Sequence, residues 1–276
     1  MRAADEILGA ATPPDAVRIA AAAAMFREAD LSAGRLKTYS DSSLGKVYGG
    51  LYGAAYTFPE DPVFLRMQRA VLDEKLRRPR PAASEVRRMH RNYVAARMFG
   101  EAAALAGRFP DISFQAVPKT VTDDTSRRTK WRVFDIPENG STVTLKALDP
   151  GSGRKVVMTM FPGCAVAEKA MTSIMAAPEL SAAFREYGML LTARFSLENA
   201  RLWKTSFNFP RFYIAYKASD FPEMDYRTSP NFYFLRDGEV KFHFFGWNTR
   251  VGPSSGTAQM AKGLRAIGAL AGGSAR

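Results

Sequence analysis

The spacing of apolar residues changes part-way along the 276-residue chain, and this change most constrains the fold. Between residues 15 and 110 apolar side chains recur every three to four positions, which is typical of amphipathic helices. After residue 131 they alternate with polar ones, as in Trp131–Ile136 and Thr142–Leu148, which is typical of strands. We therefore predict an α-helical domain at 15–110, a connector at 111–130 and an α/β domain at 131–276.

The first domain is predicted to consist of helical hairpins. Residues 1–14 end in Thr12–Pro13–Pro14 and are expected to form a flexible lead-in. Asp15, Ser40–Ser43 and Asp61 are suitable N-caps, and Pro62 suits the first position of a helix. The predicted helices cover 16–29, 44–58, 62–79 and 85–110, the last broken at Gly100.

The run NYVAARMFGEAAALAGRFP resembles a tetratricopeptide-type hairpin. It has an aromatic and small residues on its first helix, an aromatic at the turn, alanines on its second helix and a closing proline. Only two such hairpins are visible, and about three are usually needed for an independent array. A general two-helix packing without a peptide-binding groove is therefore an equal alternative, and a protein partner of this domain stays open.

The stretch Arg154–Met175 is expected to hold the functional site. Val156–Phe161 is an uncharged apolar run that suits a strand buried on both faces of a sheet. Pro162–Gly163 predicts a turn, and the residues after Cys164 have helical spacing. The chain's only cysteine is thereby placed at a helix N-terminus, where unpaired backbone N–H groups favour an anion and lower the pKa of a thiol.

The rest of the second domain is predicted to alternate strands and helices. A segment from Pro178 ends at Gly188, Ser196 caps a helix over 197–207, and Asp237–Gly238 joins two strands. Whether Phe212–Tyr216 pairs in the main sheet is left open. The other expected strands are 189–195, 231–236 and 239–247, followed by a helix around 258–270.

Composition narrows the chemistry. A single cysteine excludes an internal disulfide and every multi-cysteine metal site, and we predict no metal and no cofactor. Lysine and arginine number 39 against 27 aspartate and glutamate, but the excess is spread along the chain. The densest basic run lies between Lys75 and Arg91. No nucleic-acid-binding motif accompanies this run, so we expect a solvated helix surface and no nucleic-acid partner.

Neither a secretory signal nor a transmembrane segment is predicted. Asp5 and Glu6 occupy the place of a basic leader, and Arg18 interrupts the first apolar run. No apolar stretch reaches the ~18–20 residues that a membrane span needs.

The order of elements after residue 131 resembles the thioredoxin-like superfamily, in particular its extracytoplasmic thiol–disulfide oxidoreductases. Three stretches carry the resemblance: NGSTVTLKALDPGSGRKVVMTMFPGC, SPNFYFLRDGEV and FHFFGW. It covers about half of the chain and implies a mixed sheet flanked by helices. It places Cys164 at the nucleophilic cysteine and Pro230, preceded by Ser229, at a cis-proline. By the same resemblance the substrate-binding residues would be Pro162, Gly163, Ser229 and Pro230.

One departure from the family pattern limits the activity. Ala167 stands where these proteins have a second, resolving cysteine, so self-contained dithiol exchange is excluded. Mixed-disulfide chemistry with a protein or a small thiol remains. The alternative is a non-enzymatic interaction protein with a degenerate thioredoxin-like domain. A peroxidase is disfavoured by Phe161, three residues before the cysteine, and copper delivery by the lack of a second cysteine.

The resemblance also bears on location. It implies a periplasmic or other extracytoplasmic protein if a signal segment has been removed from this sequence, and a cytoplasmic protein otherwise. For His90 and His243 a surface or packing role is expected.

Overall fold

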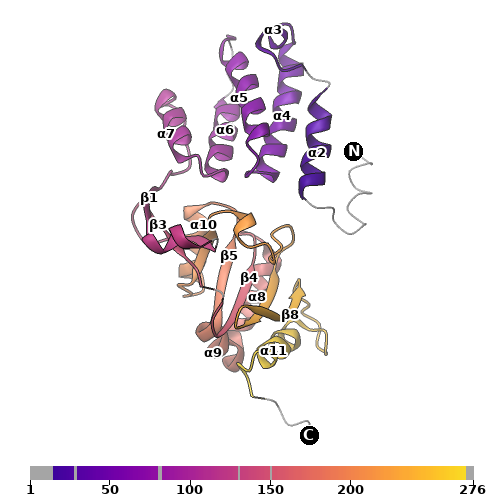
Figure 1. The fold of residues 1–276 in the computed structure, drawn as a ribbon, viewed down its shortest axis with the longest axis vertical. Coiled ribbons are helices and arrows are strands. Elements are labelled where there is room, and N and C mark those ends of the chain that lie inside the picture. Colours follow the sequence, from indigo (N-terminus) through magenta and orange to yellow (C-terminus); the bar gives the residue numbers. More distant parts are fainter. Residues whose placement is uncertain (1–14, 28–29, 80–82, 130, 150, 272–276) are drawn as a thin grey trace. The chain divides into compact units, whose positions relative to one another are not determined.

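The computed structural model describes residues 15–27, 30–79, 83–129, 131–149 and 151–271; the expected lead-in at 1–14 lies outside these ranges. The chain divides into two compact units, Met1–Val117 and Pro118–Arg276. The described residues of the first unit are helical and those of the second form a mixed sheet with flanking helices (Figure 1). The predicted fold class, an α/β part preceded by helices, is confirmed.

Two helix starts in the first unit follow the expected caps, whereas Asp15, expected as an N-cap, is the first residue of its helix. The Ser40 hydroxyl accepts a hydrogen bond from the Ser43 N–H at 3.1 Å, and the Asp61 carboxylate accepts one from the Val63 N–H at 2.9 Å. Pro62 occupies the first turn of its helix. The helices are α2 (Asp15–Arg27), α3 (Ala33–Leu36), α4 (Asp41–Thr57), α5 (Pro62–Leu76), α6 (Ala83–Ala95) and α7 (Phe99–Arg108).

The break between α6 and α7 differs from the prediction. It falls at Arg97, whose φ of 61° is left-handed, whereas Gly100 lies inside α7. The Met98 N–H donates to the Tyr93 carbonyl and the Arg97 N–H to the Val94 carbonyl, which is the hydrogen-bond pattern of a Schellman motif. Because glycine usually fills the left-handed position, an arginine there gave no signal in the sequence.

A chain of buried polar side chains joins α4, α5 and α6. Tyr48, Gln68 and Asn92 are each 0% exposed. The Gln68 amide donates to the Tyr48 hydroxyl at 2.9 Å, and the Asn92 amide donates to the Gln68 carbonyl oxygen at 2.8 Å. Tyr48 in turn donates to the Glu85 carbonyl at 2.5 Å. These bonds pair polar groups that would be costly to bury alone, with the Asn92 Oδ1 atom left without a hydrogen-bond partner, and they constrain how the three helices pack.

The second unit is built on a mixed sheet. In the part of the chain that the structure describes, eight strands have the order β1-β3-β2-β6-β5-β4-β7-β8. Strand β4 is parallel to β5 and antiparallel to β7, and β7 is antiparallel to β8. The strands are β1 (Lys119–Thr122), β2 (Arg132–Asp135), β3 (Thr142–Ala147), β4 (Arg154–Thr159), β5 (Gly188–Thr192), β6 (Phe212–Ala215), β7 (Asn231–Arg236) and β8 (Glu239–Phe245). The helices of this unit are α8 (Ala165–Ala176), α9 (Pro178–Tyr187), α10 (Leu197–Ser206) and α11 (Gly256–Ala266), with 3-10 turns η1 (Asp124–Arg128) and η2 (Ala218–Asp220).

Two features of the sheet were not predicted. Strand β1 and turn η1 lie within the stretch interpreted as a connector, and β1 pairs in parallel with β3. All four residues of β1 are exposed, so no alternation with a core was available to reveal it. Strand β6, whose pairing was open, lies between β2 and β5.

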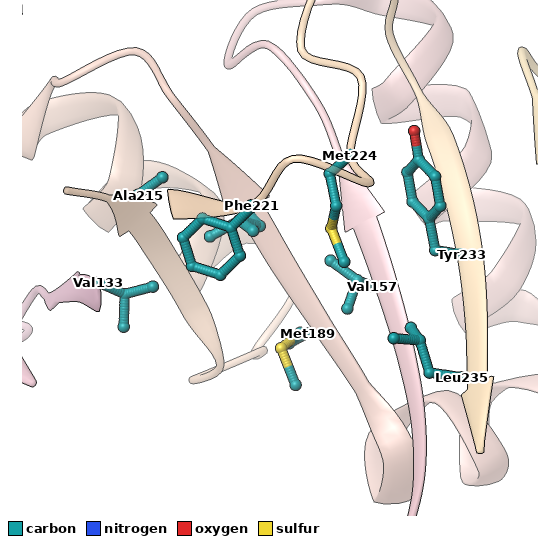
Figure 2. Packing of buried hydrophobic residues seen from close by; sticks show 9 residues of the cluster. Val133, Val157, Met189, Ala215, Phe221, Met224, Tyr233 and Leu235 are labelled. Atoms are coloured by element: carbon teal, nitrogen blue, oxygen red, sulfur yellow. The ribbon is translucent and has the colours of Figure 1, made fainter. Parts of the chain in front are cut away.

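The two faces of the sheet are covered differently. On one face α9 packs on β4 and β5, and α11 packs on β7 and β8. There Gly263 of α11 lies so close to Phe234 that an added Cβ would be 2.4 Å from the ring. On the other face, Val157, Leu191 and Leu235 form a buried apolar cluster with residues of the loop before β7 (Figure 2). A loop rather than a helix therefore closes this face.

Candidate functional site

A tight turn ends the central strand and presents the cysteine. The Cys164 N–H donates to the Phe161 carbonyl at 3.0 Å, which closes a β-turn with Pro162 and Gly163 at its centre. Gly163 has φ +83°, the value that the third residue of a type II turn requires, and proline suits the second position. The sequence Phe-Pro-Gly-Cys thus encodes the turn directly. Gly163 is exposed and Pro162 is half-buried.

Cys164 is the N-cap of α8, as expected. Its carbonyl accepts the Glu168 N–H at 3.0 Å, whereas its side chain forms no capping hydrogen bond. The side chain is half-buried. In the first turn of α8, Ala167 is 0% exposed, whereas Val166 is 40% exposed. Position 167, where the family resemblance would place a second cysteine, therefore faces the core, and the apolar side chain of Val166 lies on the surface two residues from Cys164.

The Ser229–Pro230 loop meets the cysteine turn. The Cys164 Sγ lies 3.7 Å from the Ser229 carbonyl oxygen, and the Ser229 hydroxyl accepts the Phe161 N–H at 3.0 Å. The peptide bond between Ser229 and Pro230 is cis. Pro230 is buried, and its carbonyl accepts the Gly246 N–H at 2.8 Å. Cys164, Pro162, Gly163, Ser229 and Pro230 are thus neighbours at one edge of the sheet, with Ser229 nearest the sulfur.

The surroundings favour the thiolate of Cys164. Burial raises the pKa of the thiol, and so does the nearby Glu168 carboxylate. The Ser229 hydroxyl and the backbone N–H groups of Ala167 and Val166 outweigh both, so the pKa lies below that of an ordinary cysteine. The N–H groups belong to the first turn of α8, where they have no helical partner. The Ser229 carbonyl acts the other way, because it accepts a hydrogen bond only from the protonated thiol.

Apolar contacts anchor the loop that carries Ser229. Phe221 is 0% exposed and Met224 is 6% exposed, and both belong to the cluster on this face of the sheet. Figure 2 shows both side chains directed onto the strands, towards Val157 and Met189. Burying two large side chains stabilises the loop by about 3–5 kcal/mol at ~2 kcal/mol each. Ser229 is therefore held by a packed segment.

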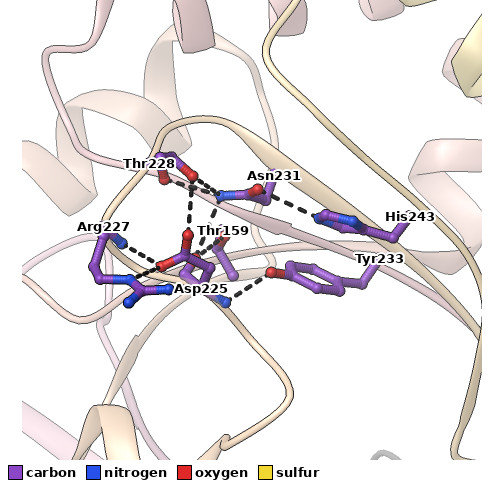
Figure 3. Close-up of polar contacts among 7 residues, drawn as sticks. All are labelled: Thr159, Asp225, Arg227, Thr228, Asn231, Tyr233 and His243. Carbon is purple, nitrogen blue, oxygen red and sulfur yellow. Dashed lines mark hydrogen bonds and ion pairs between the residues drawn. The ribbon is translucent and has the colours of Figure 1, made fainter. Parts of the chain in front are cut away.

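Polar contacts hold the part of the same loop that contains Asp225, Arg227 and Thr228 (Figure 3). The Asp225 carboxylate accepts hydrogen bonds from the Arg227 N–H and guanidinium at 2.8 Å and from the Thr228 hydroxyl at 3.2 Å. The Asp225 carbonyl accepts the Thr159 hydroxyl at 2.8 Å, and its N–H donates to the Tyr233 hydroxyl at 2.7 Å. Asp225 thereby ties the loop to both β4 and β7.

Asn231 and His243 extend this network. Asn231 is 2% exposed, and its amide donates to the Thr228 carbonyl at 3.0 Å and hydroxyl at 2.9 Å. The side-chain oxygen of Asn231, Oδ1, lies 3.3 Å from His243 Nε2. The His243 ring stacks on the Tyr233 ring with a centroid distance of 4.5 Å. Burial lowers the pKa of His243, with the Asp225 carboxylate acting against it.

These supporting residues were missed in the sequence. Thr159, Asp225 and His243 lie far apart in the chain, and their contacts depend on the antiparallel pairing of β7 with β4 and β8. The one local signal was the Asp-x-Arg-Thr order at 225–228, which suits an aspartate that accepts hydrogen bonds from residues two and three positions on. His243 proved to pack on Tyr233, in line with the packing role expected for it.

Comparison with known proteins adds one distant likeness. Among solved structures, a thioredoxin-like protein from Bacteroides caccae matches with a TM-score of 0.30 and 10% sequence identity, over 84% of this chain and 80% of that one. No family model and no curated protein matches the sequence. Functional inference therefore depends on the contacts of this chain itself.

Among the described helices, none combines the length and the apolar character needed to cross a membrane.

Proposed function

We propose that Cys164 performs single-cysteine thiol–disulfide chemistry, forming a mixed disulfide with a protein or a small thiol. The observation that carries the proposal is the setting of the sulfur. It is half-exposed at the start of α8, in contact with Ser229 on an anchored loop, and its pKa is lowered. A thiolate in such a place is the reactive form of cysteine.

The chemistry divides into two exchanges. In the first, the Cys164 thiolate attacks one sulfur of a disulfide R–S–S–R′, the S–S bond breaks, and R′–S⁻ leaves with the bonding electron pair. Cys164 is then joined to R by a new disulfide. In the second, an external thiolate attacks this mixed disulfide and releases Cys164 as a thiolate. An external thiol is required because the buried Ala167 offers no sulfur.

The residues around the sulfur suit an extended peptide as substrate. Ser229 and the Pro162–Gly163 turn flank Cys164 and are at least partly exposed, whereas Pro230 is buried and supports Ser229 from behind. Phe245, which pairs with Asn231 across β7 and β8, is 72% exposed, and Val166 is 40% exposed. Exposed apolar side chains on the elements that carry a reactive group favour a protein substrate over a small thiol alone.

The test is the rate of Cys164 alkylation by iodoacetamide as a function of pH. Because the chain has one cysteine, the adduct mass reports a single site. We expect a sigmoidal profile whose midpoint lies below that of free cysteine, and no labelling in the Cys164→Ser variant. A midpoint at or above that of free cysteine, or no labelling of the folded protein, would exclude the redox function.

One observation favours a second candidate, a non-enzymatic interaction module. Ala167, which stands at the place of the resolving cysteine, is 0% exposed, so a small apolar side chain packs there in place of a second thiol. In that case the helical unit and the apolar surface near the site would bind a partner. Cys164→Ala would then leave the protein's binding and cellular role unchanged. If the protein instead has the redox function, the same variant should abolish both.

A further inference from the structure

The edge of the sheet at β8 is a second candidate binding surface, and it is independent of the proposed redox function. In the part of the chain that the structure describes, β8 is the last strand on its side of the sheet and pairs only with β7. It is seven residues long, whereas β1, at the opposite edge, has four. Long edges are usually protected in natural proteins, because an unpaired edge binds other strands.

The backbone of β8 directs hydrogen-bonding groups outward at two residues. The Gly246 N–H donates to the Pro230 carbonyl at 2.8 Å, so these residues occupy a hydrogen-bonded position of the ladder between the strands. Such positions alternate along antiparallel strands with pairs that are not bonded to each other. His243 and Phe245, three residues and one residue before Gly246, belong to the second kind. Their N–H and C=O groups therefore point away from β7, and they have no hydrogen-bond partner among the described residues.

The side chains of the same two residues form an aromatic surface beside the open backbone. Phe245 is 72% exposed, and His243 is exposed as well. They lie on one face of β8, because side chains two residues apart in a strand point the same way. Charged side chains and bulges usually protect an edge, but here Glu239, Lys241 and a register shift all precede Phe242. The last four residues of β8 have no such protection.

We infer that β8 pairs antiparallel with β8 of a second copy of this chain, about a two-fold axis at Phe244. This register places His243 of each copy opposite Phe245 of the other, so each of the two pairs exchanges both of its hydrogen bonds. It also places each imidazole beside a phenyl ring, and aromatic cross-strand pairs stabilise a sheet. Glu239 and Lys241 lie outside the paired stretch, so no like charges are opposed there.

A second copy fits this edge better than another partner does. The outward groups require an extended strand, and the same edge on a second copy supplies one with matching spacing. A two-fold axis makes the contact self-complementary and closes the assembly at two chains. The edge that each copy keeps is β1, which is short and begins with a lysine, so the sheet does not extend further.

Three properties of the dimer follow. One strand pair is a small interface, so the dimer should dissociate on dilution. Each copy carries a formal net charge of +12, so added salt should strengthen the dimer by screening the repulsion between copies. The dimer covers Phe245, so a polypeptide substrate of Cys164 would compete with the second copy for this side chain.

Sedimentation equilibrium of the full-length Cys164→Ser chain tests the dimer without disulfide cross-links. We expect the mass to rise from monomer to dimer with concentration. Phe245→Pro removes an outward N–H but no bond to β7, and Phe245→Lys replaces the aromatic ring by a charge, so each should weaken the dimer at least tenfold. Val251→Lys is the matched control, because Val251 is fully exposed outside β8, and it should leave the dimer unchanged. Circular dichroism checks that each variant is folded.

Cysteine cross-linking tests the register. In the Cys164→Ser background, a His243→Cys chain and a Phe245→Cys chain are mixed and oxidised. Paired residues lie about 5.5 Å apart, within reach of a disulfide, so the mixed dimer should form faster than a dimer of either chain alone. Intact mass identifies the products. A monomer at every concentration, a dimer that both Phe245 substitutions leave intact, equal weakening by Val251→Lys, or faster cross-linking of either chain alone would overturn the inference.

Discussion

The sulfur of Cys164 lies 3.7 Å from the carbonyl oxygen of Ser229, a residue 65 positions further along the chain. The same serine accepts the Phe161 N–H through its hydroxyl, so both ends of Ser229 contact the cysteine turn. A single residue thus links the loop before β7 to the start of α8. The properties of the thiol should depend on it.

Ser229→Ala tests this link. The variant removes a hydroxyl that favours the thiolate, so we expect the pKa of Cys164 to rise and the alkylation rate near pH 7 to fall severalfold. The rate at high pH, where the thiolate is fully formed, should not change. The lost Phe161 hydrogen bond should cost about 1 kcal/mol of unfolding free energy. Ser173→Ala is the control: Ser173 lies on α8, the helix that Cys164 caps, and its replacement should have neither effect. A lower rate for Ser229→Ala at high pH would instead indicate that the variant alters access to the sulfur.

Asp225→Asn tests the polar anchor of the loop. Burial raises the pKa of Asp225, but hydrogen bonds from Arg227 and Thr228 outweigh it and hold the pKa below its usual value. A carboxyl whose pKa is lower in the folded state contributes stability that is present above the unfolded pKa of ~3.9 and is lost as pH falls through the folded value. The variant should therefore lose about 1 kcal/mol at neutral pH, after discounting for partial exposure.

Urea unfolding measured from pH 7 down to pH 2 gives the matching readout. The wild type should lose more stability on acidification than Asp225→Asn, because only the wild type must protonate this group. Glu223→Gln removes an exposed carboxylate of the same loop and should follow the wild type. Parallel pH dependences for wild type and Asp225→Asn would show that Asp225 does not anchor the loop electrostatically.

The elements that local chemistry specifies were predictable. Ser40, Asp61–Pro62 and Pro162–Gly163 act through hydrogen bonds and φ values within four residues, so the sequence alone indicated the starts of α4 and α5 and the turn before Cys164. The placement of Cys164 at the N-terminus of a helix followed from that turn. The residues that determine each of these features lie within the feature itself.

The remainder depends on contacts that the local sequence does not encode. Strand β1 is exposed along its whole length and is defined only by its pairing with β3. Asp225 meets Thr159 only because β7 runs antiparallel beside β4. Arg97 occupies a position that glycine normally fills. In each case the determining neighbour lies elsewhere in the chain or the residue type departs from the usual preference.

Gly263→Ala should lower the free energy of unfolding, although replacing glycine by alanine inside a helix usually raises it. Alanine in a helix interior is about 1 kcal/mol more favourable than glycine, but here its Cβ would lie 2.4 Å from the ring of Phe234. Overpacking a core costs about 1–3 kcal/mol, so we expect a net loss of about 1–2 kcal/mol. Tryptophan fluorescence reports this unit specifically, because Trp131, Trp203 and Trp247 all lie in it. In a Phe234→Leu background the same substitution should cost less, and equal costs in both backgrounds would refute the clash.

Ala167→Cys should give the protein the resolving thiol that it lacks. Residues three apart in a helical turn are neighbours, so a thiol at position 167 can reach a mixed disulfide on Cys164 and release the bound group. Wild-type protein loaded with glutathione should keep the adduct until external thiol is added, whereas Ala167→Cys should lose it without any. Ala170→Cys is the matched control: Ala170 is equally buried on α8 but lies one turn further along, about 9 Å of helix rise from residue 164. Intact mass measured over time distinguishes the three, and an adduct that persists in Ala167→Cys would mean that the sulfur of Cys164 is not directed towards the start of α8.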